Sequence, residues 1–378
     1  MYRTAVGWLA WELTYSTGWL GIVAFADLVP TVLLSIVSGA FADRFGFMRI
    51  IRLSQGAAVV FTTLLAALIL TGHINIYWLL VISIFLGAAE ALGQPARMAA
   101  VNAMVTKREL SSAIALGSAS FNGSRIIGPA IAGGLILWTG AGVVILLCAA
   151  IFLVFLLQLQ TIHIIENKSA RRGAGNLIGE IGSGVTYVFA HQSIRFVMVL
   201  LAATSFFIRP VIELMPAISG QIFNSGPTGL ALLLASIGTG ALTASLLIAR
   251  RGKLGGLTAL LIFSMIMTGV TLMMSMQFQN IWIASAFLVL MGAFMLSGNV
   301  SAQTLVQNAV DPDYRARVMS LFMVFAYGLP ALGAVIMGWI AAVAGLQATI
   351  GAGAMFMLLF WLWAWPRRKQ MSVQLEAD

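Results

Sequence analysis

The sequence predicts an all-α polytopic membrane protein made of two six-helix halves, and three observations carry this prediction. Of the 378 residues, 60% are hydrophobic and 9% are charged, whereas a soluble domain has roughly half and a quarter. Apolar stretches of about twenty residues, long enough to cross a ~30 Å hydrocarbon core, recur along the whole chain. The longest polar interval, residues 164–193, separates six of these stretches from six. The spans and their short loops must therefore carry the function.

Twelve apolar spans can be placed along the chain. The first is short, because sixteen helical residues reach only about 24 Å, and we expect the beginning of this helix to be missing, so that the first helix is incomplete. The spans lie near residues 1–16, 20–42, 50–71, 76–96, 111–138, 141–163, 194–220, 228–249, 254–276, 280–305, 315–343 and 346–366.

The basic residues predict how these spans are oriented. Lys and Arg gather in every second connection and in the tail, while the other connections contain neither. By the positive-inside rule, the basic loops and the C-terminus should be cytoplasmic in a cell (inner) membrane. The net charge of +9 is thus explained by topology, and we expect no nucleic-acid partner. The loop residues of this group include Arg44, Arg49, Lys107, Lys168, Arg171, Arg250 and Arg315.

The polar interval also divides the chain into segments. We expect an N-terminal half at 1–163, a linker at 164–193, a C-terminal half at 194–366 and a cytoplasmic tail at 367–378. Apolar residues at helical spacing between 177 and 189 indicate an amphipathic segment on the membrane surface, and a plain linker helix is the simpler interpretation. The halves resemble each other weakly, since NAMVTKREL before the fifth span echoes QNAVDPDYR before the eleventh. Duplicated halves are typical of transporters.

The loop between the second and third spans reads GAFADRFGFMR and brings charge between two apolar runs. Gly39 and Gly46 allow close helix approach and a tight turn. Asp43 can accept hydrogen bonds from the N-terminus of a neighbouring helix, where the macrodipole favours an anion. The alternative for Arg44 and Arg49 is a purely topological role.

The fifth span contains a second glycine pattern, SRIIGPAIAGG. Gly128, Pro129 and Gly133 give a thin, bent helix face that can slide against the opposite half. Ordinary close packing of a membrane helix is the alternative.

These two patterns resemble motifs of the major facilitator superfamily. GAFADRFG is similar to its loop between the second and third spans, and SRIIGPAIAGG resembles the fifth-span motif of its antiporters, with Ser124 and Ala132 where glycine is usual. The runs GQPARMAAVNAMV, RPVIELMPAISGQIF and AVDPDYRARVMSLF look like the branch of enterobactin-type siderophore exporters and multidrug efflux proteins. The resemblance implies a major facilitator fold of two pseudo-symmetric halves, a loop that latches the cytoplasmic side, and proton-coupled export by alternating access.

Ionisable residues at membrane depth are costly and are therefore candidates for substrate binding or proton coupling. Depth estimates at about 1.5 Å per residue place Glu90, Arg3 and Arg125 at one level of the first half, where they can neutralise one another. Asp27 and Arg209 match in depth across the halves. The resemblance implies that spans one, two, seven and eight close an outer gate, so we expect these two residues to pair when that gate is shut, with Glu213 as a competing partner. A structural ion pair is the alternative for each. The candidates are Asp27, Glu90, Arg125, Arg209 and Glu213.

No enzymatic pattern accompanies these residues. The histidines are scattered, GxxxxGKS/T is absent, and we expect neither a metal nor a cofactor. The leading hypothesis is a secondary transporter that exports a drug or a siderophore-like small molecule in exchange for protons, with the lipid bilayer as its surroundings and a monomer as the simplest assembly. Uptake by the same fold, a lipid scramblase, a membrane enzyme and a non-transporting receptor are the alternatives.

Overall fold

The computed structural model describes residues 1–105, 109–162, 177–251, 255–311 and 313–376, without some side chains inside helices, among them those at 35–44 and 125. The described residues are mostly helical and form no strand. The elements are α1 (Tyr2–Thr14), α2 (Thr17–Phe45), α3 (Phe47–Leu70), α4 (Ile76–Met104), α5 (Leu110–Thr161), α6 (Leu177–Ala190), α7 (Gln192–Phe207), η2 (Arg209–Ile212), α8 (Met215–Ala217), η3 (Ile218–Ile222), α9 (Gly226–Arg251), α10 (Leu257–Ser275), α11 (Ile281–Ala309), α12 (Arg315–Met323), η4 (Val324–Gly328), α13 (Leu329–Ala344), α14 (Leu346–Ala364), η5 (Trp365–Arg367) and α15 (Arg368–Leu375).

Each predicted span coincides with a helix or with consecutive helical elements. Within the described ranges, nine segments are long and apolar enough to cross a membrane, and a shorter apolar helix covers Thr17–Thr31. One of the nine, Ile127–Thr161, contains the end of the fifth span and nearly all of the sixth, and Gly140 breaks α5 between them with φ 77° and ψ 166°. A positive φ of this kind is readily adopted only by glycine, and the chain reverses there. The predicted all-α membrane fold is confirmed.

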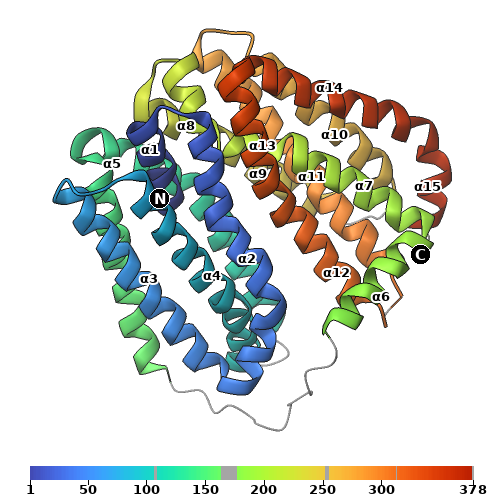
Figure 1. The fold of residues 1–378 in the computed structure, drawn as a ribbon. Coiled ribbons are helices and arrows are strands. Elements are labelled where there is room, and N and C mark those ends of the chain that lie inside the picture. The colour runs from blue at the N-terminus through green and yellow to red at the C-terminus, as the bar shows by residue number, and fades with distance from the viewer. Residues whose placement is uncertain (106–108, 163–176, 252–254, 312, 377–378) are drawn as a thin grey trace.

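The two ends of the helices differ in charge. We define the basic side as the side where α2 meets α3, where α9 ends at Arg251 and where α12 begins at Arg315. The neutral side holds the opposite connections, among them Tyr15, Gly140 and Gly345, and these connections contain no Lys or Arg. Figure 1 shows the two halves meeting on the neutral side, at the top, and diverging below it.

Close contacts on the neutral side hold the halves together. α2 packs against α13, and α5 packs against α9. The Thr17 hydroxyl donates a hydrogen bond to the Gly338 carbonyl across the halves, at 2.8 Å. At Gly21 a Cβ atom would collide with the Ala334 carbonyl, and at Gly133 with Ala231. Small residues permit this close approach, as in membrane helix pairs generally.

α6 and α15 extend the fold on the basic side. In α6, Tyr187 donates a hydrogen bond to the Asp311 carboxylate at 2.9 Å and stacks on Tyr314 at 4.4 Å. Residues 177–190 are thus a helix, as the linker pattern predicts, and its Phe189 is exposed.

The described part of the C-terminal tail packs against the helices of the second half. α15 packs on α10 and α11, with Met371 and Leu375 buried. The Glu376 carboxylate accepts hydrogen bonds from the backbone N–H groups of Gly256 at 2.6 Å and Thr258 at 2.7 Å. A carboxylate at this position caps the start of α10 and interacts favourably with its dipole.

Candidate functional site

An ion pair lies in the first half, below the contacts of the neutral side. The Arg3 guanidinium in α1 is 2.7 Å from the Asp27 carboxylate in α2. α4 fixes the position of Asp27, because a Cβ at Gly87 would collide with the Asp27 carbonyl. The Thr31 hydroxyl bridges the same crossing, with its oxygen 3.3 Å from the Asp27 carbonyl and 3.2 Å from that of Gly87. Asp27 therefore sits where α2 and α4 touch most closely.

The second half brings further charges to this pair. Pro210 and Pro216 interrupt the seventh span, which is divided into α7, η2, α8 and η3. Glu213, in the middle of this interrupted stretch, interacts electrostatically with Arg3 and Asp27 as well as with Arg209. The cluster of Arg3, Asp27, Glu213 and Arg209, which we call the charge cluster, thus spans both halves.

Packing between α1 and the seventh span explains how these charges meet. A Cβ at Gly7 would lie 3.3 Å from Pro216, and one at Gly220 would collide with the Trp11 indole. Arg3 is one helical turn from Gly7, and Glu213 is three residues from Pro216. The two charged residues therefore lie beside the same helix contact.

The prediction that Asp27 pairs directly with Arg209 was wrong. Arg209 donates to the Ala326 carbonyl in η4 at 2.8 Å and lies over the Tyr327 ring, while Asp27 pairs with Arg3. The depth estimate failed because it began the second span at residue 20, whereas α2 begins at Thr17. With the observed bounds, Arg3 and Asp27 lie within about 2 Å of the same depth.

Glu90 also differs from the expectation. Its carboxylate is 2.6 Å from the Arg97 guanidinium, two turns further along α4. Arg97 neutralises it within the same helix, so Glu90 does not need Arg3 as its direct partner. The Arg125 side chain lies outside the described residues.

Comparison with known proteins identifies the family of this chain. The model of a family described as transmembrane secretion effectors matches residues 1–372. The chain belongs to this family of major facilitator transporters. The family consists of transporters and not enzymes, as the sequence predicted.

Relatives that match over nearly the whole chain include a siderophore transporter and a drug efflux pump. The staphyloferrin A transporter of Staphylococcus aureus is 26% identical over 353 residues, which cover 92% of this chain and 87% of that protein. The multidrug efflux pump Tap of Mycolicibacterium fortuitum is 24% identical over 371 residues, covering 94% and 88%. The resemblance to siderophore and multidrug transporters is confirmed.

Solved structures share the fold. A bacterial homologue of the human lysosomal transporter Spinster, inward-facing and occupied, has a TM-score of 0.77 at 13% identity, covering 100% of this chain and 95% of that one. The nucleoside transporter NupG has a TM-score of 0.67 at 11% identity, covering 97% and 96%. The chain therefore has the major facilitator fold.

The structure describes the fifth-span glycine motif more fully than the loop motif between the second and third spans. Gly46 adopts φ 89° and begins α3, which accounts for the tight turn, and Arg49 is exposed in the first turn of that helix. The side chains of Gly39, Asp43 and Arg44 lie outside the described residues, so the latch stays a prediction. Gly133 packs on α9 of the other half, while a Cβ at Gly128 would approach the Met1 nitrogen to 2.9 Å. Pro129 lies between them inside α5.

A further arginine, close to the loop between the second and third spans, has a structural role. Arg52 in α3 donates to the carbonyls of Leu159 at 3.1 Å and Ile162 at 3.0 Å, at the end of α5. A cation at a helix C-terminus is favoured by the dipole. Among the described residues, no three or more His, Cys, Asp or Glu side chains come together in a group that could hold a metal ion.

Proposed function

We propose that this transporter exports a siderophore-like or drug-like small organic molecule by alternating access, driven by proton binding at Asp27. The observation that carries the proposal is the charge cluster, in which an Arg3–Asp27 pair of one half lies within electrostatic range of Glu213 in the other. If the positive-inside rule holds, the basic side is cytoplasmic and the closed neutral side is external. The structure then corresponds to an inward-open state.

The charges determine whether protonation of Asp27 favours closing or opening of the neutral side. With Asp27 ionised, Arg3 has a partner in its own half, and Glu213 is both attracted by Arg3 and repelled by Asp27. With Asp27 protonated, this repulsion disappears and Arg3 attracts Glu213 across the halves. Proton binding therefore favours the closed neutral side, and closing that side favours proton binding, as linked equilibria require. In an exporting antiporter, the proton-bound protein must return to the inward-open state, in which the neutral side is closed.

A general estimate shows that a charge interaction of this kind can supply part of the free energy of the switch. Two unit charges about 4 Å apart interact by roughly 4 kcal/mol at an effective dielectric constant of 20. Moving a two-state equilibrium from 1:99 to 99:1 needs about 5.5 kcal/mol. Substrate binding has to supply the rest, so neither ligand alone completes the cycle.

Transport into inverted membrane vesicles tests the proposal. In the wild type, an acidic lumen should drive accumulation of one or more compounds from a panel of labelled siderophores and drugs. Asp27→Asn keeps the shape of the side chain and removes its charge, so it should lose the gradient-driven accumulation while retaining substrate binding. Full proton-driven transport by Asp27→Asn would refute the role of Asp27.

A matched variant controls for the removal of a carboxylate. Glu12 lies in α1 near the neutral side, is exposed, and has no ion pair within the described chain. Glu12→Gln should keep wild-type transport at equal expression. Loss of transport in both variants would indicate a general effect of acidic residues near the neutral side and not coupling through Asp27.

A further inference from the structure

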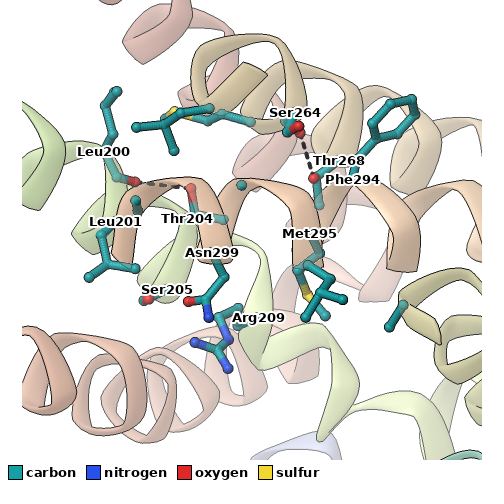
Figure 2. A pocket seen from close by; sticks show the side chains of 16 residues that line it. Leu200, Leu201, Thr204, Ser205, Arg209, Ser264, Thr268, Phe294, Met295 and Asn299 are labelled. Carbon is teal, nitrogen blue, oxygen red and sulfur yellow. Dashed lines mark hydrogen bonds between the residues drawn. The ribbon is translucent and has the colours of Figure 1, made fainter. Parts of the chain in front are cut away.

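The cavity inside the second half has room for water but not for an organic ring. It lies between α7, α10 and α11 and has a volume of about 60 Å³, and one water needs roughly 10–15 Å³. Figure 2 shows Ser205 and Asn299 at one side of the cavity and Ser264 at the other. Their buried side-chain oxygens have no hydrogen-bond partner within the described chain, so waters that bond to them are favoured. A larger ligand therefore binds elsewhere, and the outer surface at the end of the last span offers charged and aromatic groups for one.

The last span ends in a group of tryptophans and basic residues. α14 has 19 residues and is about 28 Å long, close to the ~30 Å thickness of the hydrocarbon core. It begins after Gly345 on the neutral side, so its last turn and η5 reach the headgroup level on the basic side. We call this group the tail patch, and it consists of Trp363, Trp365, Arg367, Arg368, Lys369 and, on the adjacent α7, Arg195.

Aromatic rings hold two of these arginines in place. The Arg367 guanidinium lies 5.0 Å from the centre of the Trp363 ring and donates a hydrogen bond to the Trp363 carbonyl. The Arg368 guanidinium lies over the Trp365 ring at 3.9 Å. Trp363 in turn stacks on Phe196 of α7 at 5.2 Å. A cation–π contact uses the face of a guanidinium, so the N–H donors at its edge can bond to an anion.

The tail patch carries four positive charges without an anionic partner in the described chain. None of its basic residues forms an ion pair with a described Asp or Glu. Arg195, one residue before Phe196, donates to the Phe189 carbonyl at 3.2 Å, which is a neutral partner. Because α15 packs on α10 and α11, the basic residues in its first turn are held at this place. An anion at the membrane surface is therefore favoured here.

An apolar stripe leads along α14 to these charges. Met355, Leu359, Leu362 and Trp363 follow one another at helical spacing, and their side chains are all exposed. In a membrane-spanning helix, an exposed apolar stripe faces the acyl chains of the bilayer. Arg367 lies four residues after Trp363. A phospholipid whose chain lies on this stripe therefore has its phosphate next to Arg367.

We propose that the tail patch is a binding site for an anionic phospholipid, whose phosphate is held by Arg367 and Arg368 and one of whose acyl chains lies on the exposed stripe of α14. A lipid is selected over a free phosphate because only a lipid contacts both the charges and the stripe. Phosphatidylglycerol is selected over phosphatidylcholine because the phosphatidylcholine headgroup has no net charge. The site lies outside the charge cluster, so it depends neither on proton coupling nor on the direction of transport.

Two short-chain lipids form a matched pair of probes for this site. Dioctanoyl phosphatidylglycerol and dioctanoyl phosphatidylcholine share their acyl chains and differ in net charge. Their binding to the purified full-length protein in a neutral detergent can be followed by native mass spectrometry and by the concentration-dependent rise in Tm. We expect phosphatidylglycerol to bind at least tenfold more tightly, since each cation near an anionic lipid contributes about fivefold. Equal binding of the two lipids would overturn the proposal, and an equal rise in Tm with glycerol 3-phosphate would refute a lipid as the ligand.

Paired variants separate the tail patch from the general charge of the basic side. Arg367→Gln together with Arg368→Gln should remove the preference for phosphatidylglycerol. Arg250→Gln together with Arg315→Gln removes the same charge from two exposed arginines of the same side and the same half, and it should keep the preference. Equal loss of the preference in the two double variants would indicate diffuse attraction and refute the site.

A further pair of variants tests the role of the rings. Trp365→Leu keeps every charge and removes the ring under Arg368, so the preference should fall about two- to fivefold. Trp282→Leu is its control, because Trp282 is an exposed tryptophan on the neutral side, and it should leave the preference unchanged. A wild-type preference in Trp365→Leu would refute a site built on these rings.

Discussion

Gly133 offers a direct test of how the neutral side closes. A Cβ at this position would lie 2.7 Å from the Pro227 carbonyl oxygen and would collide with the Ala231 side chain. Ordinary contact begins at 3.4 Å, so Gly133→Ala forces α5 and α9 apart by at least about 0.7 Å. Overpacking of this kind costs about 1–3 kcal/mol. Because this contact joins the halves, we expect the closed neutral side to be disfavoured by roughly 5- to 150-fold.

Spin labels on the two halves measure this shift. Cysteines at His73 and Ala348, both exposed on the neutral side, can be labelled in a Cys148→Ser background. Double electron–electron resonance should show a larger long-distance population in Gly133→Ala than in the parent.

The adjacent glycine supplies the matched control. A Cβ at Gly134 meets nothing within 4 Å, so Gly134→Ala adds the same methyl group to the same helix without a collision. This variant should reproduce the parent distance distribution. Identical distributions for Gly133→Ala and Gly134→Ala would refute the argument that the α5–α9 contact holds the neutral side closed.

Three further predictions concern orientation, the tail and α6. A cysteine at Asn224 should react with impermeant thiol reagents from outside intact cells, and one at Arg250 should not; the reverse pattern would invert the topology. Glu376→Gln should weaken the cap of α10 by about 1 kcal/mol, seen as faster amide hydrogen exchange at Thr258, and unchanged exchange would contradict this role of the carboxylate. Burial raises the pKa of Tyr187 above its usual value, so the folded state holds this proton more tightly and stability should fall as pH rises above about 10. Tyr187→Phe should lose that part of the pH dependence, and a wild-type alkaline profile in the variant would exclude this explanation.

The membrane fold and most span boundaries could be predicted from the amino-acid sequence alone. Hydrophobic length identifies a membrane helix because every backbone polar group in lipid must be bonded within the segment. The break at Gly140 and the turn at Gly46 were also visible, since both positions require a backbone conformation that glycine adopts most readily. The family could be recognised from short motifs because these motifs also mark turns and close helix contacts, where few residue types are tolerated.

The pairing of charges needed the tertiary structure. The sequence named Asp27, Glu90, Arg209 and Glu213 as costly residues at membrane depth, but the partners turned out to be Arg3 for Asp27 and Arg97 for Glu90. Depth along a helix fixes one coordinate of a side chain, and a three-residue error in a helix start shifts it by about 4.5 Å. Rotation about the helix axis and the crossing of neighbouring helices fix the other two coordinates, and only packing such as that of Gly87 on Asp27 decides them.

The cavity in the second half was likewise decided by packing. Arg209 could be named from the sequence as an ionisable residue in an apolar span, but no local pattern singled out Ser205 or Ser264. Their hydroxyls are distinctive because three helices leave a space around them in which no other described side chain reaches their oxygens. Such a space is a property of how helices from distant parts of the chain fit together, and no local pattern of residues encodes it.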